Sequence, residues 1–201
     1  MKIEVRSLRK YKDVNSKTMA SLNLVLNDAI IIRDVKLFKT EKGLQVLMPA
    51  RKTTGGNILV IANPTNNKIS EEIMKCVLDA YDDGVISQGN LEELEITELK
   101  MKIINNPNTP RLKAIVMITF NDAITINDIR IIETENGLFV VMPTARNSED
   151  DYYYDLVIPT TKKYYEEITN RILEGYKKIA PEEKMQSSYS QIKVHVLGIK
   201  R

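Results

Sequence analysis

The pattern of apolar and polar positions divides the first ninety residues into short strands followed by one helix. Five segments show the period-two alternation or the β-branched content of a strand: 2–11, 18–26, 29–38, 44–48 and 58–61. Asn27-Asp28 joins two of them and predicts a hairpin, because both side chains tolerate unusual φ and bond to local backbone. The polar stretch 51–57 is predicted to be a loop. From about residue 66, apolar residues recur at the spacing of a helix that covers one face of a sheet.

The same order of elements occurs a second time. The stretch from Asn27 to Lys52 returns, with no gap, as Asn121 to Arg146, and 13 of the 26 positions are identical. The period of 94 residues exceeds the 20 to 50 residues of a solenoid unit, so it indicates a duplicated domain. The second copy predicts strands and then a helix at 93–104, 111–120, 123–132, 137–142, 153–158 and 161–179.

The repeat predicts an α+β protein with two tandem copies of a small antiparallel β-sheet domain, each ending in a helix. We expect copy 1 at residues 1–83, a linker at 84–92, copy 2 at 93–180 and a tail at 181–201. Within the tail, 192–199 alternates enough to predict an extra strand at a sheet edge. A domain of about ninety residues buries a limited fraction of its surface. The two copies are therefore expected to pack together as an intrachain pseudo-dimer.

Composition is that of an ordinary globular protein, with 43% hydrophobic and 28% charged residues. No apolar run approaches the roughly 20 residues of a membrane span, and residues 1–13 lack the apolar core of a signal peptide. Cys76 is the single cysteine, which excludes an internal disulfide and cysteine-based metal sites and is typical of a cytoplasmic protein. Cys76 also falls on the apolar stripe of the first helix, so we expect it in the core.

Charge differs between the two copies. Residues 1–90 carry 14 Lys/Arg against 10 Asp/Glu, whereas residues 91–180 carry 11 against 15. Nucleic-acid binding depends on local positive potential, so copy 1 is the better candidate for it. The basic residues along 6–17 are compatible with a phosphate-contacting surface or with a charged edge strand that discourages aggregation.

No arrangement of residues typical of catalysis is present, and we expect neither an enzyme nor a cofactor. Two carboxylates recur in the shared block, Asp28/Asp122 and Asp34/Asp128. A symmetric acidic pair can bind a cation, but turn capping and cross-strand pairing explain these residues more simply.

The motifs NDAIxIxD and TExGLxVxMP, followed by a proline and an amphipathic helix, resemble the SpoVG family of bacterial septation and sporulation regulators. The resemblance covers residues 2–83 and 93–178, and the segment from Gly43 to Pro64 matches without a gap. It implies an antiparallel sheet with a C-terminal helix, dimer formation and nucleic-acid binding. A tandem copy then corresponds to a dimer fused into one chain.

The resemblance also implies a set of phosphate contacts. The basic loop of the family falls on Arg51 and Lys52 in copy 1, whereas copy 2 keeps Arg146 alone. Basic residues at the helix starts complete the predicted nucleic-acid-binding set: Arg51, Lys52, Lys68, Arg146, Lys162 and Lys163. A further family arginine is replaced by Leu59 and Tyr154.

Copy 2 departs from the basic pattern in two ways. Glu149, Asp150 and Asp151 enter the loop that is expected to approach phosphates, and like charge there repels a polyanion. Copy 2 also has a tyrosine cluster, formed by residues 152–154, 164 and 165, which copy 1 lacks. These rings are suited either to packing against a core or partner, or to stacking on single-stranded bases.

Two functions remain open. The first is a non-enzymatic, cytoplasmic regulator that binds DNA or RNA, chiefly through copy 1, with further homo-oligomers possible and no membrane partner. The alternative is a protein-interaction module in cell division or septation that has lost nucleic-acid binding, which the acidic second copy favours.

Overall fold

The structure is a computed structural model that describes residues 1–12, 16–53, 55–147, 152–186 and 194–198. Copy 1 is built from short strands and one helix, listed in chain order: β1 (Ile3–Lys10), β2 (Thr18–Leu26), β3 (Ile30–Thr40), β4 (Gly43–Leu47), β5 (Ala50–Lys52), β6 (Ile58–Val60), β7 (Ala62–Pro64) and α1 (Asn67–Asp82). Asn66 caps α1, since its side chain accepts a hydrogen bond from the Ile69 amide at 3.0 Å.

The linker contributes β8 (Ser87–Gln88), and copy 2 repeats the same order: β9 (Ile96–Ile103), β10 (Leu112–Phe120), β11 (Ile124–Thr134), β12 (Gly137–Val141), β13 (Thr144–Arg146), β14 (Tyr153–Asp155), β15 (Val157–Pro159) and α2 (Lys162–Gln186). Beyond α2, β16 (Val194–Gly198) pairs with the edge strand β9. In copy 1 the corresponding edge, β1, is paired over two residues by β8. The sequence therefore forms the predicted α+β fold.

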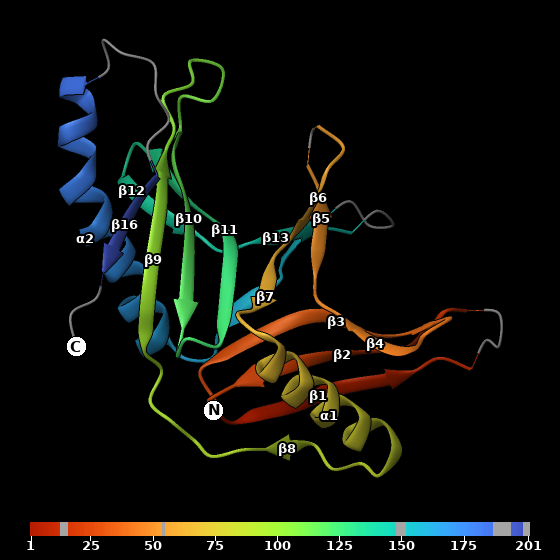
Figure 1. Ribbon diagram of the computed structural model, residues 1–201. Coiled ribbons are helices and arrows are strands. Elements are labelled where there is room, and N and C mark those ends of the chain that lie inside the picture. The colour runs from red at the N-terminus through yellow and green to blue at the C-terminus, as the bar shows by residue number, and fades with distance from the viewer. Residues whose placement is uncertain (13–15, 54, 148–151, 187–193, 199–201) are drawn as a thin grey trace.

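The two copies exchange strands. β7 of copy 1 pairs with β11 of copy 2, and β15 of copy 2 pairs with β3 of copy 1. After each exchanged strand the chain returns to its own copy. Helix α1 therefore packs on β1 and β4 of copy 1, and α2 packs on β9 and β12 of copy 2 (Figure 1). This reciprocal exchange is a domain swap within one chain, and it confirms the predicted intrachain pseudo-dimer.

The two β-hairpin turns meet where the copies join. Asn27 and Asp28 adopt φ values of 48° and 54°, and their counterparts Asn121 and Asp122 adopt 50° and 49°. Residues with short polar side chains tolerate this left-handed conformation, as the sequence predicted. Asn27 is buried, its Oδ1 accepts the Lys2 amide at 2.8 Å, and its Nδ2 lies 3.5 Å from Asn121 Oδ1.

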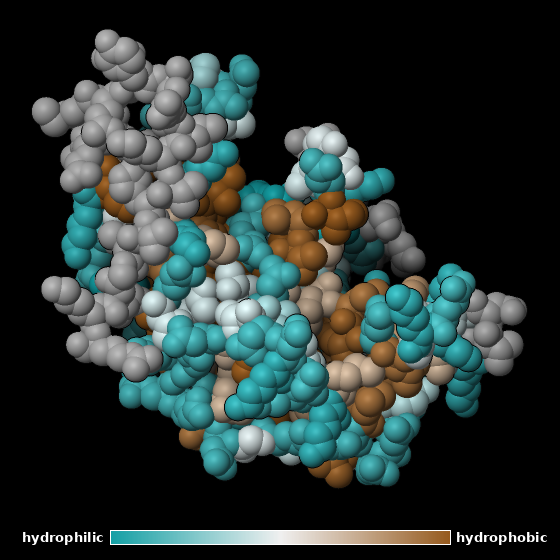
Figure 2. Space-filling view, in the orientation of Figure 1, coloured by the Kyte–Doolittle hydropathy of each residue, from teal (hydrophilic) through white to brown (hydrophobic). Residues whose placement is uncertain are grey.

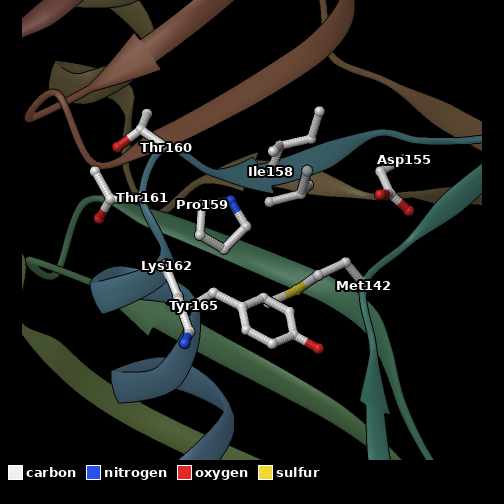
Figure 3. A pocket seen from close by; sticks show the side chains of 9 residues that line it. Met142, Asp155, Ile158, Pro159, Thr160, Thr161, Lys162 and Tyr165 are labelled. Atoms are coloured by element: carbon white, nitrogen blue, oxygen red, sulfur yellow. The ribbon is translucent and has the colours of Figure 1, made fainter.

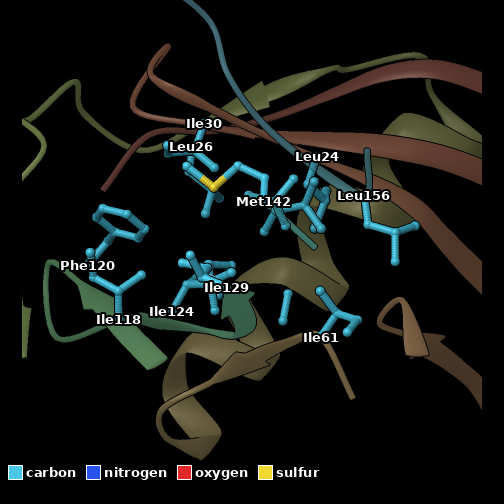
Figure 4. Packing of buried hydrophobic residues seen from close by; sticks show 14 of the residues in the cluster. Leu24, Leu26, Ile30, Ile61, Ile118, Phe120, Ile124, Ile129, Met142 and Leu156 are labelled. Carbon is cyan, nitrogen blue, oxygen red and sulfur yellow. The ribbon is translucent and has the colours of Figure 1, made fainter. Parts of the chain in front are cut away.

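One hydrophobic cluster runs through both copies. Ile61 and Leu156, equivalent residues of the exchanged segments, are fully buried with Leu24, Ile118 and Ile129 of the two sheets (Figure 4). The amide of Ile61 donates to Pro49 O at 2.7 Å, and that of Leu156 donates to Pro143 O at 2.8 Å. Burial of both segments at one centre supplies the core that each copy alone lacks. Cys76 is also fully buried, as expected, and burial raises the pKa of its thiol to about 11.

Two sequence-based expectations were wrong in detail. The predicted loop 51–57 begins with residues of the strand β5, and the predicted strand 58–61 ends at Val60 as β6, with a separate strand, β7, starting after Ile61. The same division occurs between β14 and β15 at Leu156. The chain changes sheets at these points, so a single apolar run serves two different partners.

Candidate nucleic-acid interface

Two short hairpins extend from the exchanged segments towards the opposite copy. We call β5–β6 arm 1 and β13–β14 arm 2 (Figure 1). In arm 1, Arg51 lies opposite Leu59 and Lys52 lies opposite Ile58. In arm 2, Ala145 lies opposite Tyr154 and Arg146 lies opposite Tyr153. Because side chains alternate along a strand and opposite residues share a face, each arm has two faces with different partners.

The inner face of arm 1 is held by an ion pair between the copies. Arg51 Nε lies 2.6 Å from Asp128 Oδ2 on β11, and Arg130 Nη2 lies 2.9 Å from the same oxygen. The Asp128 side chain is only 3% exposed, so two guanidinium groups compensate a buried carboxylate. Asn127 Nδ2 adds a hydrogen bond to Val60 O at 3.0 Å. Arg51 thus fastens arm 1 to copy 2.

The inner face of arm 2 is held on the opposite copy by a hydrogen bond from a neutral side chain instead of an ion pair. Tyr154 of β14 donates its hydroxyl to Asp34 Oδ2 of β3. Burial, together with this hydrogen bond, raises the pKa of Tyr154 to about 12. The Arg33 charge acts on the Tyr154 pKa in the opposite sense. The backbone amide of Arg33 donates to Leu156 O, two residues after Tyr154, at 2.8 Å.

The two acceptors, Asp34 and Asp128, are equivalent residues at irregular points of β3 and β11. Their φ values are 60° and 62°, in the left-handed region that aspartate and asparagine tolerate better than most residues. The strand register shifts beside both residues, and a bulge of this kind redirects a side chain. The repeated NDAIxIxD motif therefore encodes one acceptor for each arm. No group of carboxylates, histidines or cysteines within the described ranges is arranged to hold a metal ion.

The outer face of each arm combines a basic residue with an exposed apolar one. Lys52 is exposed beside Ile58, whose exposed fraction is 66%. Arg146 is exposed beside Tyr153, whose exposed fraction is 69%. Figure 2 shows hydrophobic side chains gathered over arm 1, with hydrophilic residues around them. The two outer faces are chemically alike although the two inner faces are not.

The other predicted contacts lie at the starts of the two helices. Lys68 pairs with Glu72 at 3.9 Å, Lys162 with Glu166 at 3.4 Å, and Lys163 with Glu167 at 3.7 Å. All three lysines are highly exposed, and exposed pairs of this type contribute little stability. Their ammonium groups remain accessible, but each has a carboxylate one turn away.

The basic residues of β1 have structural partners. Arg6 pairs with Glu4 and raises its own pKa by doing so, Arg9 lies 5.6 Å from the Tyr11 ring centre, and Lys10 lies 4.5 Å from that of Tyr81. These contacts agree with a charged edge strand. The loop of copy 2 that was expected to approach phosphates contains Glu149, Asp150 and Asp151. These three acidic residues lie outside the described residues.

The sequence predicted the basic residues of both arms and the tyrosine cluster of copy 2, but not which residues surround each basic side chain. Hairpin pairing places Ile58 beside Lys52 and Tyr153 beside Arg146. The two aspartate acceptors become parts of the site only through the strand exchange. The sequence did contain a signal, since Lys52 and Arg146 are equivalent in the repeat whereas Arg51 has no basic counterpart. The repeated basic position is exposed, and the unrepeated one forms the ion pair.

A depression of about 380 Å³ lies between β15 and the start of α2 (Figure 3). Its lining includes Met142, Thr160, Lys162 and Tyr165, with Asp155 at the opposite side from Lys162. The labelled side chains do not form a nucleophile with an adjacent base, so the depression does not have the geometry of a catalytic site. Within the described residues, no helix is long and apolar enough to cross a membrane.

The fold and the paired arms define a class of protein: two small α+β domains, joined in tandem, that assemble by exchanging strands. The sequence profile of the SpoVG family matches residues 1–83 and again residues 94–178. The chain belongs to the SpoVG family, with two copies of the family's domain.

Individual relatives support the same division. A putative septation protein SpoVG of Finegoldia magna is 40% identical over 83 residues, which are 41% of this chain and 74% of the relative. The corresponding protein of Agathobacter rectalis is 37% identical over 42% of this chain and 93% of its own length. The corresponding protein of Clostridium acetobutylicum is 33% identical over 47% of this chain and 96% of its own length. Each relative is therefore similar to about one copy of the unit that occurs twice here.

Proposed function

We propose that this chain is a non-enzymatic regulatory protein of the septation type that binds nucleic acid through the outer faces of its two arms. One observation carries the proposal: Lys52 and Arg146 occupy equivalent positions, and both are exposed on arms that are anchored by their other face. Because each arm is anchored before binding, nucleic acid can contact its basic residue without the entropy cost of ordering a mobile loop. Relatives named as septation proteins support the cellular role.

The proposal changes the role of Arg51. An arginine that compensates buried Asp128 supports the arm, and we assign the principal phosphate contacts to Lys52 and Arg146 because they occupy equivalent, exposed positions. Lys68, Lys162 and Lys163 add positive charge at the helix starts, reduced by their glutamate partners.

The test is a titration of the whole chain against random double-stranded DNA, single-stranded DNA and RNA at two salt concentrations. The double variant Lys52→Ala/Arg146→Ala is expected to weaken binding about equally for all sequences. Two lost contacts with duplex DNA lower the slope of log affinity against log salt by about 1.8. The matched control, Lys75→Ala/Lys178→Ala, removes two exposed lysines from the helices. Its slope of log affinity against log salt is expected to stay closer to that of the wild type than the slope of Lys52→Ala/Arg146→Ala.

Exposed Ile58 and Tyr153 also favour a second candidate, a septation module that binds another protein, because exposed apolar side chains mark protein interfaces as well. Absence of binding to every nucleic acid at low salt would reject the first proposal. A protein partner that is retained by the wild type and lost in Ile58→Ala would then support the second.

A further inference from the structure

Arm 2 differs from arm 1 in that its outer face is aromatic. Tyr153 is 69% exposed and Tyr152, just before it in the chain, is 51% exposed. The Tyr152 ring centre lies 6.0 Å from that of Tyr154, with a tilt of 52°. Tyr153 lies on the outer face of β14, whereas Tyr152 precedes this strand and packs on Tyr154, and both rings remain exposed.

Copy 1 anchors the arm that carries these rings. Tyr154 is anchored through its hydroxyl to Asp34, and Tyr152 packs against Tyr154. The backbone amide of Arg33 in copy 1 donates to Leu156 O at 2.8 Å, and Arg146 lies opposite Tyr153 on the neighbouring strand. Hairpin pairing therefore places exposed Tyr153 beside Arg146, and the strand exchange anchors the arm that carries both residues on copy 1.

We propose that the two exposed rings of arm 2, Tyr153 on its outer face and Tyr152 just before β14, each stack on a base and make the protein prefer single-stranded nucleic acid to duplex. This inference rests on the proposed function and specifies the ligand of the same arms. An exposed ring next to a guanidinium group, as Tyr153 is next to Arg146, matches a single strand that offers flat bases and phosphates together. In a duplex the bases already stack on one another, and opening a step takes a few kcal/mol.

The charge of arm 2 favours bases over phosphates as its contact. The sequence between β13 and β14 includes Glu149, Asp150 and Asp151, which oppose a polyanion. Stacking on a base does not require positive charge, so the rings add affinity where electrostatic attraction is weak. Arm 1 has Ile58 at the position of Tyr153, and an aliphatic side chain provides no flat surface for a base.

The test compares three probes of equal length with the full chain: single-stranded oligothymidine, a random duplex, and a sugar-phosphate oligomer without bases. Tyr153→Ala and Tyr152→Ala are each expected to weaken binding of oligothymidine about 5- to 160-fold, the range measured for loss of one stacked base. Binding of the duplex and of the baseless oligomer is expected to remain unchanged. Tyr153→Phe retains the ring and is expected to restore binding.

Ile58→Ala is the matched control, because it removes an equally exposed apolar side chain from the equivalent position of arm 1. It is expected to leave the preference for single strands unchanged. Equal weakening of all three probes by Tyr153→Ala, or no change in oligothymidine binding, would overturn the stacking proposal. In both cases loss of binding in Lys52→Ala/Arg146→Ala would still support the proposed function, whereas failure of the wild type to bind any probe would reject both.

Discussion

The two arms solve the same structural problem with different side chains. Arm 1 reaches the aspartate of the opposite copy from its first strand, with Arg51. Arm 2 reaches the equivalent aspartate from its second strand, with Tyr154. Leu59 lies opposite Arg51 in arm 1, and Ala145 lies opposite Tyr154 in arm 2. Neither of these apolar residues can reach the aspartate with a polar group. The pseudo-twofold geometry is therefore retained while the chemistry of the two contacts has diverged.

This difference shows which part of a duplicated site is free to change. The acceptors Asp34 and Asp128 are identical because the left-handed bulge restricts the residue type. The donors are not restricted in this way, since cross-strand residues of an arm can exchange the task of reaching the acceptor. A fused chain also removes the need for one sequence to serve both sides, as it must in a symmetric homodimer.

The largest effect is expected where the copies remain equivalent. Ile61→Ala and Leu156→Ala each remove a fully buried side chain from the shared core. Each is expected to lower the free energy of unfolding by about 2–5 kcal/mol. Chemical denaturation measures both values, and exposed Ile58→Ala is the control, with an effect within about 0.5 kcal/mol. A neutral result for one of the two buried variants would show that the crossing segments are not equivalent.

A smaller and unequal effect is expected at the two acceptors. Asp128→Asn removes the charge that compensates both Arg51 and Arg130, and we expect a loss of about 1–3 kcal/mol. Asp34→Asn leaves an amide oxygen that still accepts the Tyr154 hydroxyl, so its expected loss is below about 1 kcal/mol. Asparagine is the suitable replacement because it tolerates the positive φ of both positions. Equal losses would mean that the ion pair adds nothing to the arm.

The smallest expected effect on stability depends on pH and is confined to arm 2. Tyr154→Phe removes one hydrogen bond, and we expect a loss of about 1 kcal/mol near neutral pH. The pKa of the Tyr154 phenol is raised from 10.0 to about 12 in the folded state. Its contribution to stability is thus complete below pH 10 and is lost as the pH rises towards 12.

The difference in unfolding free energy between wild type and Tyr154→Phe should therefore shrink between pH 10 and 12. Denaturant titrations at several pH values measure this difference. Tyr153→Phe, at an exposed ring, is the control and should unfold as the wild type does. A constant difference over this range would contradict the buried hydrogen bond to Asp34.

Much of the fold was predictable from local patterns. The period-two alternation located the long strands, the Asn-Asp pairs located both hairpin turns, and the 3.6-residue stripe located both helices. These features depend on neighbouring residues in the chain, so one sequence is sufficient to recognise them. The arms were harder to predict, because a strand of three residues is too short to show a period.

The sequence by itself determined that the chain is a duplicated α+β domain, that Lys52 and Arg146 are equivalent, and that Asp34 and Asp128 recur. Tertiary structure alone decided that Arg51 forms an ion pair with Asp128, that Tyr154 binds Asp34, and that Tyr153 faces outward beside Arg146. The physical reason is the strand exchange. Each arm completes its contacts on residues far away in the sequence, and neither the face of a short hairpin nor its partner is encoded in the hairpin itself.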